Sequence, residues 1–214
     1  MPLIDPGDKA WQDVYRVLID CIQPRPIGFI STVDAEGRPN LAPYSFFNMV
    51  SANPPVCFFS PGVKGRGGGQ KDSHRNVLEV PEFVHNVVTE DIARRMNQTA
   101  FEYGHGESEF GPAGLTPEPS GRVRPPRVAE SPVNLECRVV DIKSFGDWPG
   151  AGTVIFGEIV LIHVREGLLD DGGRISPARL RTIGRLGGSE YCTTRDTFTL
   201  HRPRSADYRP DEMD

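Results

Sequence analysis

The triplet Lys71-Asp72-Ser73 has the residue types of an anion site. It stands at the start of the segment 72–80, "DSHRNVLEV", which reads as a helix stopped by Pro81. A helix N-terminus exposes unpaired N–H groups and partial positive charge, to which Lys71 adds a full charge and Ser73 a hydroxyl. The triplet therefore suits a phosphate. On local sequence alone, a plain helix start, in which Asp72 or Ser73 caps and Lys71 is solvated, is the favoured interpretation.

The segment 42–48, "APYSFFN", has the composition of a wall that touches a ligand. Pro43 cannot donate to a sheet ladder, so this segment belongs at an edge or a bulge. Two small polar side chains, Ser45 and Asn48, are threaded among aromatic residues. This is a poor composition for a plain core strand and a reasonable one for the side of a binding site.

Spacing argues against several other chemistries. In "GRGGGQKDS" (65–73), Gln70 precedes the lysine and Asp72 follows it, which breaks the pattern of a nucleotide triphosphate loop, and the dinucleotide fingerprint also fails at Gln70. The five histidines are scattered without zinc-ligand spacing, so we expect no metal. There is no Ser elbow and no convincing carboxylate pair. The combination of an anion-capable helix start and a ligand-facing wall suits a bound cofactor that carries its own reactivity.

The bulk composition bounds the class of protein. The chain has 214 residues, a net charge of −5, and 23 Gly and 20 Pro, which predicts one domain rich in turns and short strands. The basic residues form no stripe, so we expect no nucleic-acid partner. No long apolar stretch and no signal peptide are present, so we expect no membrane association. The four cysteines lack a CxxC pair, which favours reduced thiols and a cytoplasmic location.

The elements that must position these residues are mostly strands. Helices are expected at 8–20 (or a strand approach there), 72–80, 89–100 and 176–183. Strands are expected at 26–34, 54–62, 82–88, 133–145 and 153–169, with an irregular limb at 40–53 and short extended pieces at 184–200. Sequential strands with little helix predict a closed antiparallel barrel with peripheral helices. We expect a single domain over 1–214, with an N-terminal helical extension, a long loop at 101–131 and an extended C-terminal tail.

Several blocks together resemble one family. "PRPIGFISTVDAEGRPNLAPYSFFNMVSANPPVCFFSPG", "KDSHRN", "EFVHNVV", "AGLTPEPSGRVRPPRVAESPVNLECRVVDI" and "GEIVLIHV" follow in order from about residue 20 to about residue 192. They closely resemble the flavin reductase-like FMN-binding proteins. That group includes the nitrilotriacetate monooxygenase component B type and flavoredoxin. The resemblance implies a mainly β, antiparallel, Greek-key-like split β-barrel that forms a homodimer, with FMN (FAD is possible) near the subunit interface.

The resemblance also implies which residues contact the flavin, and it shifts the interpretation of the helix start toward phosphate binding. Phe46 and Phe47 would supply an apolar wall, although one of them is as readily ordinary core. The cofactor-binding residues implied are Arg25, Ser31, Thr32, Ala42, Pro43, Tyr44, Ser45, Asn48, Ser60, Lys71, Asp72 and Ser73.

The function implied is a flavin reductase-like oxidoreductase. It would transfer hydride from NADH or NADPH to the flavin and supply reduced flavin to a partner monooxygenase. The alternatives are an FMN-holding electron-transfer protein and a non-catalytic flavin-binding module. No acid or base is required for hydride transfer, so no catalytic residue is assigned. His85 and His163 are the candidates to face the nicotinamide, but an ordinary strand histidine with its hydrogen bonds satisfied is the favoured interpretation of each.

Overall fold

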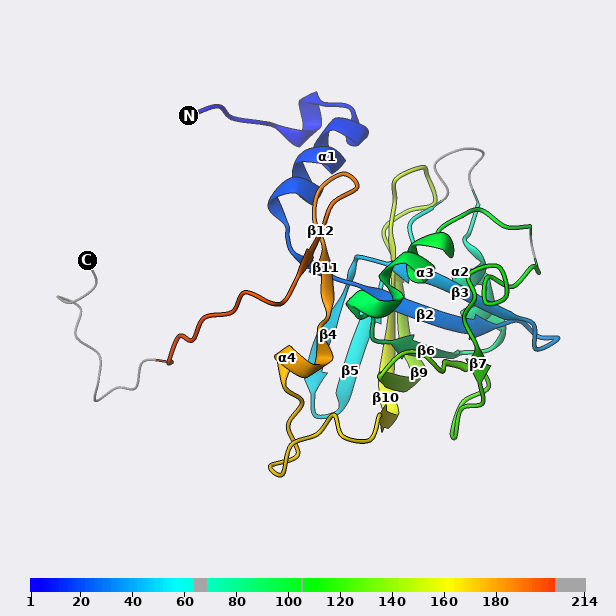
Figure 1. Cartoon of the computed structure of the whole chain (residues 1–214). Helices are drawn as coiled ribbons and strands as arrows, with labels where there is room; N and C mark the ends of the chain where they lie inside the picture. Colours follow the sequence, from blue (N-terminus) through cyan, green and yellow to red (C-terminus); the bar gives the residue numbers. More distant parts are fainter. Residues whose placement is uncertain (64–68, 105, 203–214) are drawn as a thin grey trace.

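A large antiparallel sheet organises the chain, for which a computed structural model describes residues 1–63, 69–104 and 106–202. Most of the glycine-rich segment before Lys71 lies outside these residues. The seven strands run in the order β3-β2-β6-β9-β10-β5-β4 (Figure 1). Their bounds are β2 (Gly28–Val33), β3 (Pro39–Tyr44), β4 (Phe47–Ala52), β5 (Pro55–Phe59), β6 (Glu82–Asn86), β9 (Val133–Ser144) and β10 (Thr153–Val164).

The two edge strands of this sheet, β3 and β4, are consecutive in the chain, so the sheet curls back toward itself. Gly28 of β2 marks the close approach: a Cβ atom there would lie 2.6 Å from the ring of Phe47, the first residue of β4. The Phe47 ring also packs against the His85 ring of β6, with 4.2 Å between the ring centroids. A side chain on one edge strand thus packs over the strands near the other edge, which gives a mainly β, barrel-like body.

Aromatic rings fill the interior of the curled sheet. The Phe59 ring lies 5.2 Å from Tyr44 and 5.0 Å from Phe83. Phe83 packs against Gly157, where the pairing of β10 with β9 shifts register. The glycine is needed because a Cβ there would stand 2.3 Å from the Phe83 ring. Burying a phenylalanine side chain in this way contributes about 2 kcal/mol or more to stability.

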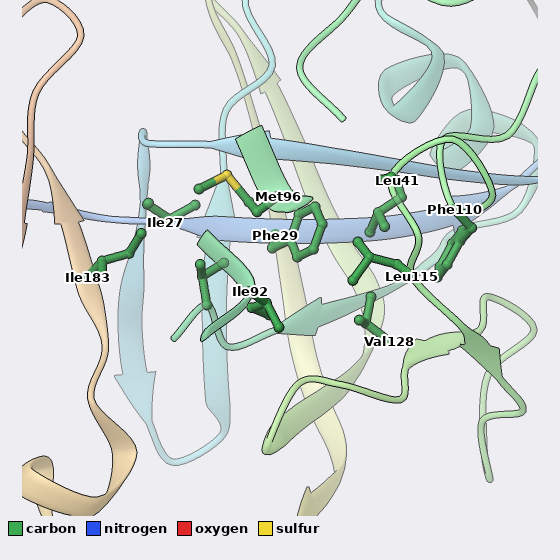
Figure 2. Close-up of a cluster of buried hydrophobic side chains, with 11 residues drawn as sticks. Ile27, Phe29, Leu41, Ile92, Met96, Phe110, Leu115, Val128 and Ile183 are labelled. Atoms are coloured by element: carbon green, nitrogen blue, oxygen red, sulfur yellow. The ribbon is translucent and has the colours of Figure 1, made fainter. Parts of the chain in front are cut away.

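A second core lies on the other face of β2, where helical segments and the long loop cover it (Figure 2). Phe29 of β2 and Leu41 of β3 point outward from the curled sheet. Ile92 and Met96 cover them from one side, and Leu115 of the loop adds a further apolar contact. The loop is therefore held against the sheet by burial of apolar surface.

The remaining elements are short. The helical segments are η1 (Pro6–Asp8), α1 (Trp11–Cys21), α2 (Asp72–Glu79), η2 (Glu90–Ile92), α3 (Ala93–Gln98) and α4 (Pro177–Leu180). Near the chain's start, α1 projects from the body beside a small sheet of β1 (Arg25–Pro26), β11 (Ile183–Arg185) and β12 (Tyr191–Thr193) (Figure 1). Within the long loop, β7 (Pro117–Glu118) pairs with β8 (Arg127–Val128). Among the described helices, none combines the length and apolar character needed to cross a bilayer.

The fold class predicted from the sequence is confirmed, including the edge position of Pro43 in β3 and the bulge at Gly157. The irregularity expected in the limb 40–53 is also present: Ser45 and Phe46 separate β3 from β4, and the pairing of β4 with β5 shifts register between Met49 and Ser51. One local expectation was wrong. The N-cap of α2 is Lys71, without a side-chain cap bond, because Asp72 is already helical and the Ser73 hydroxyl is used elsewhere.

Candidate functional site

A cleft lies where β3, the start of α2 and the long loop meet; we name it the α2 cleft. Strand periodicity places Asn40, Ala42 and Tyr44 on one face of β3, and this face forms one wall. The cleft is lined by Asp34, Arg38, Pro39, Asn40, Ala42, Pro43, Tyr44, Lys71, Asp72, Ser73, Asn76, Thr99, Ala100, Phe101, Glu102, Tyr103, Gly104, Gly106, Glu107 and Glu109. It therefore brings the helix start together with the first three residues of the "APYSFFN" segment, Ala42 to Tyr44.

The start of α2 is anchored through Ser73, which is 1% exposed. The Tyr44 hydroxyl donates to Ser73 Oγ at 2.9 Å, and the Asn40 amide meets the same oxygen at 2.8 Å. Lys71 Nζ stands 5.7 Å from the centre of the Tyr44 ring, within the range of a cation–π contact. Because these contacts fix the first turn of α2 against β3, the positive end of the helix is held at the cleft wall.

The floor of the cleft carries a buried carboxyl, Glu109, which comes from the long loop. Its Oε2 accepts from the Leu41 N–H at 2.6 Å, and the residue is 7% exposed. Burial raises the pKa of Glu109 to about 7, and the nearby Asp72 charge acts in the same direction. Arg38, on the rim, is already bonded to Asp34 at 2.6 Å. Lys71 is the other cation of the cleft's described lining, and it stands at the helix start.

A second cavity, which we name the α1 cavity, adjoins the first. Pro43 and Ala100 line both, so the two hollows lie on either side of these residues. Its lining is Tyr15, Ile19, Arg25, Ile27, Pro43, Ser45, Met96, Asn97, Ala100, Arg185, Gly188 and Tyr191. Apolar side chains of Ile19, Ile27 and Met96 form part of its wall, beside the polar groups of Arg25, Ser45, Asn97 and Arg185.

Arg25 of the α1 cavity is buried, and its guanidinium joins three segments of the chain. It donates to the carbonyls of Ile19 at 2.6 Å, Ile22 at 2.7 Å and Leu186 at 2.8 Å. A fourth contact, at 3.3 Å, reaches Ser45 Oγ. These contacts tie the end of α1 and the β11–β12 hairpin to β1, so the donors of Arg25 serve the chain's own carbonyls.

The residues predicted from the sequence separate into three groups. Ala42, Pro43, Tyr44, Lys71, Asp72 and Ser73 line the α2 cleft, while Arg25 and Ser45 share the α1 cavity with Pro43. Four others line neither hollow and stay predictions: Ser31, Thr32, Asn48 and Ser60.

The contacts of these four are local. Ser31 donates to the Pro126 carbonyl at 2.5 Å, on the outer face of β2. Thr32 Oγ1 accepts from Asn76 at 3.0 Å, behind the cleft wall. Asn48 is exposed on β4, and the Ser60 N–H donates to the Phe46 carbonyl.

The aromatic and histidine candidates are also placed. Phe47 is core, whereas the neighbouring Phe46 is about half exposed and meets Tyr15 edge-on. His85 lies inside the barrel and His163 bonds to Glu136 at 2.5 Å, so neither lines the α2 cleft or the α1 cavity. His163 is thus satisfied by a neighbouring strand residue, whereas the buried Nδ1 of His85 has no hydrogen-bond partner among the described residues.

Sequence reasoning missed Asn40, Asn76 and Glu109. Asn40 had a usable signal, since it stands two and four residues before Ala42 and Tyr44, on the same strand face. Asn76 lies one helical turn beyond Ser73, on the same face of α2, and its amide donates a hydrogen bond to Thr32 Oγ1. Glu109 had no such signal, because it comes from an irregular loop whose path the sequence does not specify.

The curled antiparallel sheet places the chain among barrel-like β proteins. Comparison with known proteins specifies the family. Residues 22–179 match the flavin reductase like domain, so the chain belongs to the flavin reductase family. Nitrilotriacetate monooxygenase component B from Bacillus cereus is 37% identical with a TM-score of 0.88, covering 94% of this chain and 98% of that chain.

Two further structures are similar. The 2-nitrobenzoate 2-nitroreductase of Pseudomonas fluorescens is 31% identical, with a TM-score of 0.83 over 94% of this chain and 96% of its own. A split-barrel-domain protein of Shewanella frigidimarina is 22% identical, with a TM-score of 0.81 over 95% of this chain and 100% of its own, which shows the fold alone. The predicted family and split-barrel fold are confirmed, and the chain is a flavin oxidoreductase in general terms.

Proposed function

We propose that this protein binds FMN and transfers hydride to it from NADH or NADPH, as a reductase that supplies reduced flavin to a separate monooxygenase. The observation that carries the proposal is the position of Lys71, Asp72 and Ser73, at the start of α2 in the wall of a cleft. In a chain of the flavin reductase family, a cationic helix start in a cleft has an obvious use in holding a flavin phosphate.

The donor set of the cleft fits the phosphate and sugar-alcohol part of FMN. Lys71 supplies charge, the first turn of α2 supplies its dipole, and the Ser73, Tyr44 and Asn40 side chains supply hydrogen-bonding groups. Asp72 and Glu109 belong to the same lining and oppose an anion electrostatically, so the phosphate is proposed to lie directly at the helix start, beside Lys71.

In this proposal the flavin ring lies in the α1 cavity, whose lining is partly apolar and partly polar. Ile19, Ile27 and Met96 give it apolar walls, and Ser45 and Asn97 give it polar groups. A bound flavin supplies the electron-accepting ring for the hydride of a reduced nicotinamide nucleotide. The protein's part is to hold the two hollows at a fixed separation through Pro43 and Ala100, so that one ligand spans them, and to keep water from the ring.

We also propose that the protein works as a homodimer. Met49 and Val50 of the edge strand β4 are 65% and 55% exposed, and Phe46 lies beside them. The helix α1 has no buried residue, although Trp11 and Leu18 are large apolar side chains. A second copy that covers β4 and α1 would remove this apolar surface from water and protect an unpaired strand edge.

Anaerobic titration with NADH and then NADPH tests the reductase proposal. Flavin-loaded protein is followed by the absorbance band near about 450 nm, typical of oxidised flavin. We expect rapid bleaching by at least one nucleotide, with re-oxidation when air is admitted. Bleaching by dithionite but by neither nucleotide would contradict the reductase proposal and favour an electron-transfer protein. If the bound flavin, once reduced, passed no electrons to any added acceptor, a non-catalytic flavin-binding module would be favoured.

Two further measurements identify the preferred flavin and the electron acceptor. Kd values for FMN and FAD, measured on flavin-free protein, decide which flavin is preferred, and we expect FMN. The similarity to a nitroreductase gives a second acceptor to include, 2-nitrobenzoate. If the FMN-loaded, NADH-reduced protein transferred electrons faster to 2-nitrobenzoate than to dioxygen or free flavin, direct nitro reduction would replace flavin supply as the proposed role.

A further inference from the structure

Two aromatic side chains stand in the lining of the α2 cleft, on the segment that follows α3. Phe101 and Tyr103 both line the cleft, and their rings meet edge-on, with 5.1 Å between the centroids and 72° between the planes. The Phe101 side chain belongs to no hydrophobic core, since the residue is 71% exposed. The pair therefore offers open aromatic surface to a ligand that occupies the cleft.

The backbone holds this pair in place through local turns. The Phe101 N–H donates to the Gln98 carbonyl at 3.2 Å, and the Tyr103 N–H donates to the Phe101 carbonyl at 3.2 Å. Just beyond the pair, the Gly104 N–H donates to the Glu107 carboxylate at 3.0 Å. Because the chain is hydrogen-bonded on both sides of the two rings, their positions are set before a ligand binds, which lowers the entropic cost of binding.

The place of the pair in the cleft indicates which part of a ligand it meets. Lys71 lines the same cleft at the helix start, and Ala100, the residue before Phe101, lies between this cleft and the α1 cavity. In the proposed function the flavin phosphate lies beside Lys71 and the flavin ring lies in the α1 cavity. The aromatic pair is then left for a second planar group, which FMN does not carry.

The polar groups around the pair favour an uncharged base and sugar. Glu102, between the two aromatic residues in the sequence, and Glu107 also line the cleft. Carboxylates accept hydrogen bonds from amino groups and sugar hydroxyls but repel phosphate. Arg38 does not offset them, because its guanidinium is bonded to Asp34 at 2.6 Å and to Glu36 at 3.0 Å. A base with an amino group, joined to a ribose, matches this arrangement.

We propose that Phe101 and Tyr103 form a stacking platform for the adenine of a dinucleotide, with the carboxylates of Glu102 and Glu107 beside its amino group and ribose. This inference rests on the proposed function, whose ligands include two dinucleotide classes that carry an adenosine. With FMN as the flavin, the adenine is that of the nicotinamide dinucleotide. FAD would bring the same group on the flavin itself. Stacking on an aromatic side chain suits adenine because the base has a flat, polarisable face.

The test removes the exposed ring and compares ligands with and without adenine. Kd values for FMN and FAD are measured on flavin-free protein, and the Kd for NAD⁺, which cannot donate hydride, is measured by calorimetry on FMN-loaded protein. We expect Phe101→Ala to leave FMN binding unchanged and to weaken NAD⁺ binding by about tenfold, the value of one lost base–aromatic stack. A similar loss for FAD would identify the flavin dinucleotide as a source of the adenine. Phe101→Trp, which restores a flat ring, should restore the affinity.

Two further variants keep the comparison specific. Phe145→Ala removes another exposed phenylalanine, one that lines neither the α2 cleft nor the α1 cavity, and should change none of the three Kd values. Phe101→Leu keeps an apolar side chain without an aromatic face and replaces Phe101→Ala if that variant does not fold. It should show the same pattern of losses.

Unchanged Kd values for both NAD⁺ and FAD in Phe101→Ala overturn the platform, as does a wild type that binds neither ligand. An equal loss for FMN and FAD also overturns it, because the flavin ring would then be the group in contact. These outcomes differ from failure of the proposed phosphate site, in which Lys71→Ala leaves FMN affinity unchanged. If Lys71→Ala weakens FMN binding while Phe101→Ala weakens nothing, only the adenine inference fails.

Discussion

Replacing His85 with phenylalanine should remove a specific sensitivity of the fold to acid. The His85 side chain faces the barrel interior from β6, next to Ile30 and Leu135 on the paired strands, and its ring stacks on Phe47. Its Nδ1 has no hydrogen-bond partner among the described residues. Burial lowers the pKa of His85 to about 3 from an ordinary value of 6.5.

The direction of the effect follows from proton binding. Between pH 6.5 and about 3, the unfolded chain binds a proton at His85 that the native state does not, so the free energy of unfolding falls as the pH falls. Lowering the pH from about 7.5 to about 5 should cost about 2 kcal/mol at this site. Glu109 acts in the opposite sense: its pKa is raised to about 7, so its stabilisation is complete below 4.5 and lost as pH rises through about 7.

Between pH about 7.5 and about 5, the effects of His85 and Glu109 on the free energy of unfolding nearly cancel. The effect of His85 is therefore visible in the difference between His85→Phe and wild type, not in the wild type alone. Urea unfolding of flavin-free protein, at fixed protein and salt concentration, gives the free energy of unfolding at the two pH values. Relative to wild type, His85→Phe should gain about 2 kcal/mol on going from about pH 7.5 to about pH 5. His201→Phe, at an exposed site, is the matched control and should show no such gain. Parallel curves for wild type and His85→Phe would refute the reasoning.

Three further predictions address packing and assembly. Gly157→Ala places a Cβ 2.3 Å from the Phe83 ring and should lower the free energy of unfolding by about 1–3 kcal/mol, whereas Gly111→Ala, with no atom within 4 Å, should not; equal values would contradict the packing argument. Met49→Glu puts a charge on the exposed face of β4 and should shift the mass in sedimentation equilibrium from dimer to monomer; a wild-type monomer would exclude the proposed dimer. Pro43→Ala should change stability by less than about 1 kcal/mol in urea unfolding, because β3 is an edge strand; global unfolding would contradict that position.

The sequence predicted the fold well because its signals were local. Alternation at 82–88 specified β6, the two long extended segments 133–145 and 153–169 specified β9 and β10, and Gly157 marked the bulge. The strand expected at 153–169 was too long, since β10 ends at Val164 and a turn follows. The pairing of β1 with β11 had no local signal, because it joins segments far apart in the chain.

The site was predictable only in part, for a related reason. Lys71–Ser73 and Ala42–Tyr44 carry their chemistry in short stretches, and the structure brings them into one cleft. Arg25 reads as a surface cation or phosphate ligand in the sequence, yet its partners are carbonyls of residues such as Leu186, reached only when the chain has folded. Glu109 depends on the path of the long loop, which apolar contacts of Phe110 and Leu115 determine.

The most direct test of the central claim is the contribution of Lys71 to the discrimination between FMN and riboflavin. The two ligands differ by the phosphate, so their Kd values on flavin-free wild type and Lys71→Ala isolate the contact at the start of α2. We predict that Lys71→Ala weakens FMN binding by about 10- to 100-fold and leaves riboflavin unchanged, while Lys143→Ala, at an exposed position on β9, changes neither. Unchanged FMN affinity, or an equal loss for both ligands, would contradict the assignment of the α2 cleft as the phosphate site.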